Sequence, residues 1–326
     1  NLLVGGLSIN LTDNGTAIIS SVSDNGNGTY TATISNTVAE AITISGTLNG
    51  TGITDTAEVT FVPGAAATAT SLLSINSATV TANGSNNTTV TVQARDAQGN
   101  NLSIGGETII LSVNGSATLS SVTDHGDGSY SAIITNTVAE AITLSGTLNG
   151  ADISSTAAMN FVADISNATQ STLSASITTL TANGVASSLI TLQVNDALGN
   201  NLSSGGETVL FSTTGNASIN TATDNGDGTY STTISNTLAE TVIVSATLNG
   251  GPVANNTNIN FVPSNSASPA QTTIDISGTS LIADGSLTTT ITVQTKDSLG
   301  NNLLVGGLSI NLTDNGTAII SSVSDN

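Results

Sequence analysis

Short apolar segments alternate along this chain with clusters of glycine, asparagine and aspartate. In residues 87–95 (NTTVTVQAR) polar and apolar side chains alternate with a period of two, which is typical of a β-strand with one buried face. Between residues 64 and 163, turn-forming clusters separate seven segments of this kind. The predicted strands are 67–82, 87–95, 107–113, 117–122, 129–136, 141–148 and 152–162. Because no helical period extends beyond one turn, the pattern predicts an antiparallel sandwich of two sheets.

The same pattern returns at a fixed interval. The segment SNTVAEAITISGTLNG (35–50) reappears as TNTVAEAITLSGTLNG (135–150) and as SNTLAETVIVSATLNG (235–250), and residues 302–326 repeat residues 1–25 letter for letter. Periodic chains are built from tandem structural units. We therefore predict an all-β chain of seven-stranded sandwiches arranged end to end. The predicted domains are the C-terminal part of a repeat (1–62), two complete repeats (63–163 and 164–263) and the N-terminal part of a repeat (264–326).

The charge of the chain indicates which classes of binding partner to exclude. It contains 22 acidic residues against two basic ones, Arg95 and Lys296, and its net charge is −20. Nucleic acids and anionic lipids need a basic surface, so we expect neither as a partner. No apolar run approaches the roughly 18 residues of a membrane helix, and we expect no membrane insertion in this segment. Cysteine is absent, so each sandwich has to fold without disulfide bonds.

The residues of one unit resemble a known family. The run VTANG, then TTVTVQARDAQGNNLSIGGETIILS, then DHGDGSYSAIITNTVAEAITLSGTLNG is similar to the bacterial immunoglobulin-like domain of the intimin/invasin type, which is strung in long arrays in giant surface adhesins. Its marks are Ala82-Asn83-Gly84, Asp96 with Gly99-Asn100, Gly128 with Tyr130, and the Thr-Leu-Asn-Gly turn. Asn101 departs from the pattern, since the family usually has proline there. The resemblance implies immunoglobulin-like sandwiches that serve mostly as spacers and in some cases as receptor binders.

Catalytic chemistry is not expected. The single histidine, His125, is replaced by Asn25 and Asn225 in the sister units, so the repeat does not depend on it. Serine and threonine are abundant, but no base is available to activate them. The unit 64–163 contains no lysine, which excludes a lysine–asparagine cross-link within it. We predict that the chain is not an enzyme and has no active site.

Repeated carboxylates are the one candidate for a binding site. If successive sandwiches meet end to end, the loop of one domain that carries a glutamate faces three acidic loop positions of the next. Carboxylates crowded in this way favour a hard cation with oxygen ligands, above all Ca²⁺. The alternative is that Asp, Asn and Gly only form hairpin turns. The predicted interdomain ligands are Glu40 with Asp96, Asp124 and Asp127; Glu140 with Asp196, Asp224 and Asp227; and Glu240 with Asp297 and Asp325.

These observations favour a mechanical function over a catalytic one. We expect a structural stalk segment of a long extracellular fibre or cell-surface adhesin, whose partners are neighbouring identical repeats or chains placed end to end. One alternative is an adhesin module that binds sugar or a receptor, but six of the seven aromatic residues recur at equivalent repeat positions and leave only Phe211 unmatched. Another alternative is a filament of separate subunits that complete each other's terminal domain, in place of a stretch of one longer polypeptide.

Overall fold

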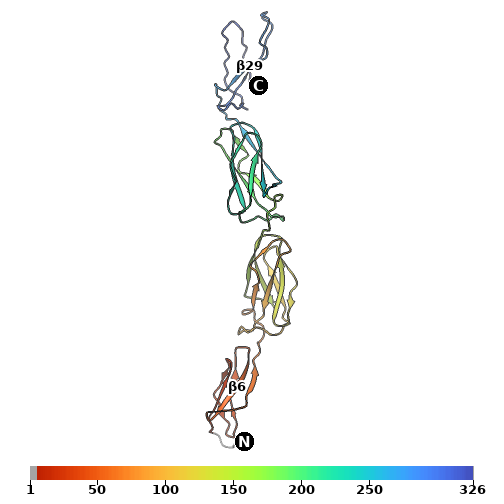
Figure 1. The fold of residues 1–326 in the computed structure, drawn as a ribbon, viewed down its shortest axis with the longest axis vertical. Coiled ribbons are helices and arrows are strands. Elements are labelled where there is room, and N and C mark those ends of the chain that lie inside the picture. The colour runs from red at the N-terminus through yellow and green to blue at the C-terminus, as the bar shows by residue number, and fades with distance from the viewer. Residues whose placement is uncertain (1–5, 326) are drawn as a thin grey trace. The chain divides into compact units, whose positions relative to one another are not determined.

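The computed structural model describes residues 6–325, and within this range the chain consists of β-strands without helices. Figure 1 accordingly draws arrows and no coiled ribbon. Two compact units divide the chain, Asn1–Val162 and Ala163–Asn326. Each holds one complete sandwich and one partial lobe, and each is described here by itself. Residues 1–5 and 326, which belong to the two predicted partial repeats, lie outside the described part.

The complete domain of the first unit is a sandwich of two five-stranded sheets. One sheet has the order β10-β18-β16-β12, with β17 added beside β16, and the other has the order β13-β15-β11-β9, with β14 added beside β15. This arrangement confirms the all-β sandwich that alternation predicted. The strands are β9 (Leu72–Ile75), β10 (Thr79–Thr81), β11 (Asn87–Gln93), β12 (Ile109–Val113), β13 (Thr118–Leu119), β14 (Thr123–Asp124), β15 (Ser129–Thr135), β16 (Ala141–Leu148), β17 (Ala151–Asp152) and β18 (Ala157–Val162).

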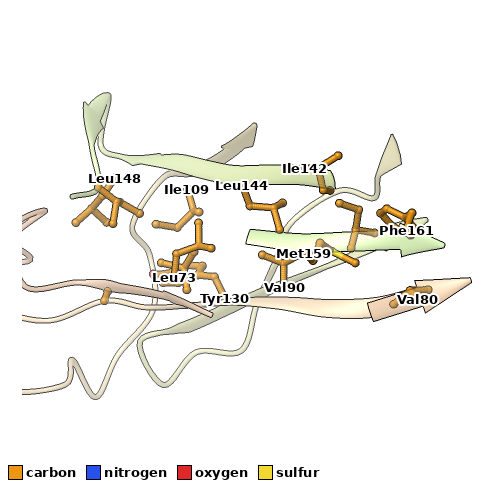
Figure 2. Close-up of a cluster of buried hydrophobic side chains, with 14 of the residues drawn as sticks. Leu73, Val80, Val90, Ile109, Tyr130, Ile142, Leu144, Leu148, Met159 and Phe161 are labelled. Atoms are coloured by element: carbon orange, nitrogen blue, oxygen red, sulfur yellow. The ribbon is translucent and has the colours of Figure 1, made fainter. Parts of the chain in front are cut away.

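The inward positions of both sheets form a single apolar core. In β11 every second residue is buried, with Val90 and Val92 fully enclosed, as a period of two requires when one face is covered. Across the sandwich, Leu144 of β16 and Phe161 of β18 complete the core, which Figure 2 shows in close-up. Tyr130 is buried among these side chains, and its hydroxyl accepts a hydrogen bond from the Glu107 backbone.

Two of the predicted strands are each divided in two. The segment 67–82 is interrupted after β9, which pairs with β11, and it resumes as β10, which runs parallel to β18 in the opposite sheet. The crossing is fixed by hydrogen bonds from Ser77 N to Thr88 Oγ1 and from Asn160 N to Ala78 O. The prediction of one continuous strand was therefore wrong, because alternation does not indicate which sheet a strand joins. The segment 152–162 similarly becomes β17 and β18, whereas the segment 117–122 contains only β13, because β14 lies just beyond it.

The Thr-Leu-Asn-Gly sequence ends β16 in a tight hairpin. Asn149 has a φ of 51° and Gly150 a φ of 84°, so two consecutive residues adopt the left-handed conformation. Asn-Gly suits such a two-residue turn, because asparagine tolerates a positive φ better than most side chains and glycine adopts it freely. The equivalent Asn49 and Asn249 have φ values of 49° and 50°. The repeated letters therefore produce a repeated turn.

The complete domain of the second unit follows the same plan. Its sheets have the orders β20-β28-β26-β22 and β19-β21-β25-β23, with β27 beside β26 and β24 beside β25. Its strands are β19 (Thr172–Ala175), β20 (Thr179–Thr181), β21 (Ser188–Gln193), β22 (Val209–Thr213), β23 (Ser218–Ile219), β24 (Thr223–Asp224), β25 (Thr229–Ser235), β26 (Thr241–Leu248), β27 (Gly251–Pro252) and β28 (Thr257–Val262).

The partial lobes carry the remaining strands. In the first unit they are β1 (Ile9–Asp13), β2 (Ile18–Ile19), β3 (Ser23–Asp24), β4 (Tyr30–Thr31), β5 (Ile34–Ser35), β6 (Ala41–Leu48), β7 (Thr51–Gly52) and β8 (Ala57–Thr60). In the second unit they are β29 (Thr273–Ile276) and β30 (Ile291–Gln294), which pair with each other. Apolar positions are more exposed here than in the complete domains: Ile291 is 36% exposed, whereas the equivalent Ile190 is fully buried.

Candidate functional site

The loop that follows β11 is organised around a buried carboxylate. Asp96 is 3% exposed, and its Oδ1 accepts hydrogen bonds from the backbone N–H groups of Gln98 (3.0 Å) and Asn100 (2.9 Å). Its Oδ2 accepts from Asn100 Nδ2 and from Gly64 N, both at 2.9 Å. The Asn100 amide, followed by the Gly64 N–H, stabilises the charged form and lowers the pKa of Asp96 to about 2. Asp96 therefore fixes its own loop and also the segment that leads into the domain.

Asn100 connects this loop to the preceding lobe of the same unit. Its Nδ2 donates to the Thr37 carbonyl at 2.9 Å, and its Oδ1 accepts from Ala39 N at 2.9 Å. One side-chain amide thus pairs with two backbone groups, as a neighbouring strand would. The second hydrogen of Nδ2 is held by Asp96, which orients the amide for this pairing. We call the arrangement of Asp96, Asn100 and the backbone of Thr37 and Ala39 the junction clamp.

The second unit contains the same clamp. Asn301 Nδ2 donates to the Thr237 carbonyl at 3.0 Å, and Asn301 Oδ1 accepts from Ala239 N at 2.8 Å. Asp297 is 1% exposed and accepts from Asn301 and, at 3.2 Å, from Ser264 N. Because the two clamps lie in separate units with the same partners, the geometry belongs to the repeat.

Asp196, the counterpart of Asp96 in the complete domain of the second unit, is fully buried. It accepts hydrogen bonds from Asn200 N and Asn200 Nδ2, both at 2.9 Å, and from Asp164 N at 3.0 Å. The carboxylate–asparagine pair and the anchored linker are therefore present here as well.

The predicted acidic ligands of the DNGDG-type loops form turns. Asp124 Oδ1 accepts from Gly126 N and Asp124 Oδ2 accepts from Gly106 N, both at 2.8 Å. Asp127 Oδ1 accepts hydrogen bonds from the hydroxyl and then the backbone N–H of Ser129, and these bonds lower the pKa of Asp127. The loop lies beside Asp96, since Ala94 N donates to Gly128 O at 2.9 Å. Asp224 and Asp227 repeat these contacts in the second unit.

The glutamates cap a turn at the other end of each domain. Glu140 Oε1 accepts from Ser116 N at 2.6 Å and from Asn136 Nδ2 at 2.9 Å, and these bonds lower the pKa of Glu140. Glu40 is held in the same way by Thr16 and Asn36, and Glu240 by Asn216 and Asn236. The role of this cap explains why a glutamate recurs at the position in every repeat.

The structure thus brings together some of the residues that the calcium hypothesis joined. The loop of Glu40 meets the loop of Asp96, as predicted, but the contact is made by Asn100 and Ala39, while Glu40 bonds to Thr16 and Asn36 of its own lobe. Among residues 6–325, no group of three or more Asp, Glu or His side chains has a metal-binding arrangement. Junctional Ca²⁺ stays a prediction.

Asn100 and Asn301 were not among the predicted site residues. In the sequence these residues stand out only as part of the repeated Gly-Asn pair. That pair indicated the family, but it did not indicate a contact with the preceding lobe. His125 lies in an exposed loop, with its Nε2 2.8 Å from Ser131 Oγ.

The comparisons with known proteins agree with this architecture. The family described as Invasin, domain 3, matches residues 1–64, 67–164 and 167–264. The solved structure of FdeC, an adhesin of Escherichia coli, is 30% identical over 79% of this chain and 87% of that chain, with a TM-score of 0.47. InvD of Yersinia pseudotuberculosis is 24% identical over 72% of each chain, with a TM-score of 0.50, and it shows the fold.

Invasin, described as a bacterial integrin-binding protein, is 21% identical over 87% of this chain and 60% of that chain, with a TM-score of 0.47. No curated protein sequence matches the chain. Among residues 6–325 no helix is long and apolar enough to cross a membrane. Invasin- and intimin-type domains are non-catalytic parts of cell-surface or extracellular proteins, which confirms the expectation that the chain is not an enzyme. The chain belongs to the Invasin, domain 3, family of adhesin domains.

Proposed function

We propose that this chain is a stalk segment of a cell-surface adhesin, whose function is to hold another part of the protein away from the cell. The observation that carries the proposal is the junction clamp, which occurs with the same four participants in both units. A spacer has to limit bending between successive domains. The clamp serves this purpose because it anchors the linker through Asp96 and ties the preceding loop through Asn100.

The distribution of aromatic residues supports a spacer over a receptor-binding module. Binding surfaces are usually enriched in exposed aromatic side chains. In this chain Tyr130, Tyr230, Phe161, Phe211 and Phe261 are all buried in sandwich cores. Phe211, the one aromatic residue without an equivalent in the sister units, is 5% exposed and packs in the core of its domain.

Small-angle scattering of the whole chain tests the stalk proposal. Successive sandwiches that each advance the axis by about 40 Å give a rod of roughly 150 Å, because strands of this length rise about 3.3 Å per residue. Such a rod has a radius of gyration of about 40 Å, whereas one compact domain of the same length has about 20 Å. A radius near the smaller value would contradict the stalk.

A second candidate is the assembly of separate chains, in which one copy completes the terminal domain of the next. Leu281 is 48% exposed and Ile291 36% exposed, whereas their equivalents Leu180 and Ile190 are 8% and 0% exposed. The rest of a domain would cover these side chains, and a second copy of this chain contains that rest in residues 27–62. Light scattering distinguishes the candidates. A mass of 32.0 kDa at all concentrations contradicts assembly, and a mass that rises with concentration supports it.

A further inference from the structure

We infer that the parallel strand pair β10–β18 is the force-resisting element of the complete domain, and that β20–β28 has the same function in the sister domain. The inference deepens the proposed stalk function, since a stalk that holds a bound partner is pulled along its chain. It concerns the strength of each domain and is independent of whether the junctions are stiff.

The direction of the two strands is the first observation. β10 and β18 are paired in parallel, in the register Thr79 with Asn160, Val80 with Phe161 and Thr81 with Val162. Tension enters the domain at the N-terminal side of β10 and leaves it at the C-terminal end of β18. In a parallel pair these two forces point in opposite directions along the same axis. The strands are therefore loaded in shear, and their hydrogen bonds have to break together.

The hydrogen bonds beyond the ladder extend the pair at both ends. Ala82 N donates to Val162 O at 2.8 Å, and Asn160 N donates to Ala78 O at 2.9 Å. In the strand that comes first in the chain, the paired residues therefore extend from Ala78 to Ala82. Strand β9 lies nearer to the linker and pairs with β11, so its bonds are loaded first. Once β9 has separated, the tension passes to β10.

Core packing adds to the resistance of the pair. Val80 and Phe161 are 8% and 2% exposed and belong to the same apolar cluster, where Figure 2 shows them toward one end. A slide that restores the hydrogen-bond register moves one strand by two residues, about 6.6 Å. This slide would remove Val80 from its place in the core before any new pairing forms. Hydrogen bonds and packing therefore oppose the same displacement.

This arrangement gives a function to the interrupted first strand. A single strand through residues 67–82 would stay beside β11 and leave β18 as the edge of its sheet. The crossing at Asn76–Ala78 instead places β10 beside the last strand of the domain. The sister domain repeats the device, with Thr179 opposite Asn260 and with Ala182 N donating to Val262 O at 2.7 Å.

Single-molecule stretching with two pulling directions tests the inference. The chain has no cysteine, so the handles through which force is applied can be attached at cysteines introduced at chosen positions. Handles at Ala65→Cys and Ile165→Cys load β10 and β18 in shear. Handles at Ser85→Cys and Ile165→Cys pull on the same end of both strands and separate them bond by bond. At one pulling speed we expect the shear direction to need roughly two-fold higher force or more, because forced unfolding follows the unfolding barrier along the direction pulled. Equal forces would overturn the inference.

A matched pair of substitutions identifies the strands involved. Ala82→Pro removes the donor to Val162, and Ala182→Pro removes its equivalent in the sister domain. In chains stretched between Ala65→Cys and Asn265→Cys, each substitution should lower the force of one of the two unfolding events and leave the other unchanged. If neither event changes, β10–β18 is not the resisting pair. Should a variant not fold, the comparison of pulling directions still decides. The scattering test of the stalk does not depend on these forces, so the two proposals fail separately.

Discussion

Replacing Asn100 by alanine is the most direct test of the junction clamp. The substitution removes the two hydrogen bonds to Thr37 O and Ala39 N, which connect the domain to the preceding lobe, and the bond from Asn100 Nδ2 to Asp96 Oδ2 inside the loop. It leaves in place the backbone bond from residue 100 to Asp96 Oδ1 and the bond from Gly64 N to Asp96 Oδ2. The loop and the linker therefore keep their anchors, and we expect the sandwich to stay folded.

The change in the free energy of closing the junction follows from the number of hydrogen bonds lost between the domain and the preceding lobe. Each neutral hydrogen bond contributes about 0.5–1.5 kcal/mol net, so two bonds contribute roughly 1–3 kcal/mol to closing the junction. Because about 1.4 kcal/mol is a factor of ten in an equilibrium constant, the ratio of closed to open junctions should fall by roughly five-fold to more than a hundred-fold. Within the sandwich itself only the bond from Asn100 Nδ2 to Asp96 is lost, since Asn100 lies outside the apolar core.

Single-molecule energy transfer across the junction measures this ratio. Ser21 and Ser121 are exposed, lie on either side of the junction, and can carry dyes as cysteines in a chain that has none of its own. In the parent chain we expect a narrow distance distribution, and in Asn100→Ala a broad one while the sandwich stays folded. Asn101→Ala is the matched control, because Asn101 accepts from Arg95 Nε within its own domain. An unchanged distribution in Asn100→Ala, or equal broadening in the control, would refute the clamp.

Three further outcomes are expected. The charged Asp96 carboxylate stabilises the clamp fully above its ordinary pKa of 3.8, and this stabilisation is lost as the pH falls through about 2. The distance distribution across the junction should therefore broaden as the pH falls from 3.8 to about 2 and stay constant above 3.8. Broadening already near neutral pH would contradict this assignment. Gly115→Ala should lower stability by about 1–3 kcal/mol in thermal unfolding, since a Cβ there lies 2.8 Å from both Glu140 Oε1 and Ile142 Cγ2, whereas Gly52→Ala, with open space around it, should be neutral. If Ca²⁺ binds at the junctions, the melting temperature should rise with the free ion and fall with a chelator, and equal curves would contradict the calcium hypothesis.

Alternation and turn residues predict most of the fold because they act locally. The period of two in residues 87–95 identifies β11, and each Asn-Gly pair after Thr-Leu marks a hairpin whose backbone is the same in three copies. The interruption of the segment 67–82 was not predictable in the same way. Residues 72–75 and 79–81 both suit a strand, and only the positions of β11 and β18 decide that they join different sheets.

The site was harder to predict than the fold, because its partners are backbone atoms. Asn100 contacts a carbonyl and an N–H group of another lobe, and neither group leaves a signature in the side chains of Thr37 or Ala39. The repeated carboxylates were visible, but a carboxylate that binds a cation and one that accepts N–H groups look alike in a sequence. Asp96 and Glu140 show the second behaviour, with every described bond formed inside the same unit.

The clamp and the strand pair differ in strength in a way that suits a stalk under tension. Opening a clamp breaks two hydrogen bonds, at roughly 1–3 kcal/mol, and leaves both neighbouring cores intact. Unfolding a domain of this size costs about 5–15 kcal/mol and, along the chain, requires β10 to slide past β18. Tension therefore opens the junctions first. These can close again without refolding, because Asp96 keeps the linker anchored and Asn100 oriented. A chain with this order of events absorbs small forces by reversible bending and keeps its domains folded until the force is large.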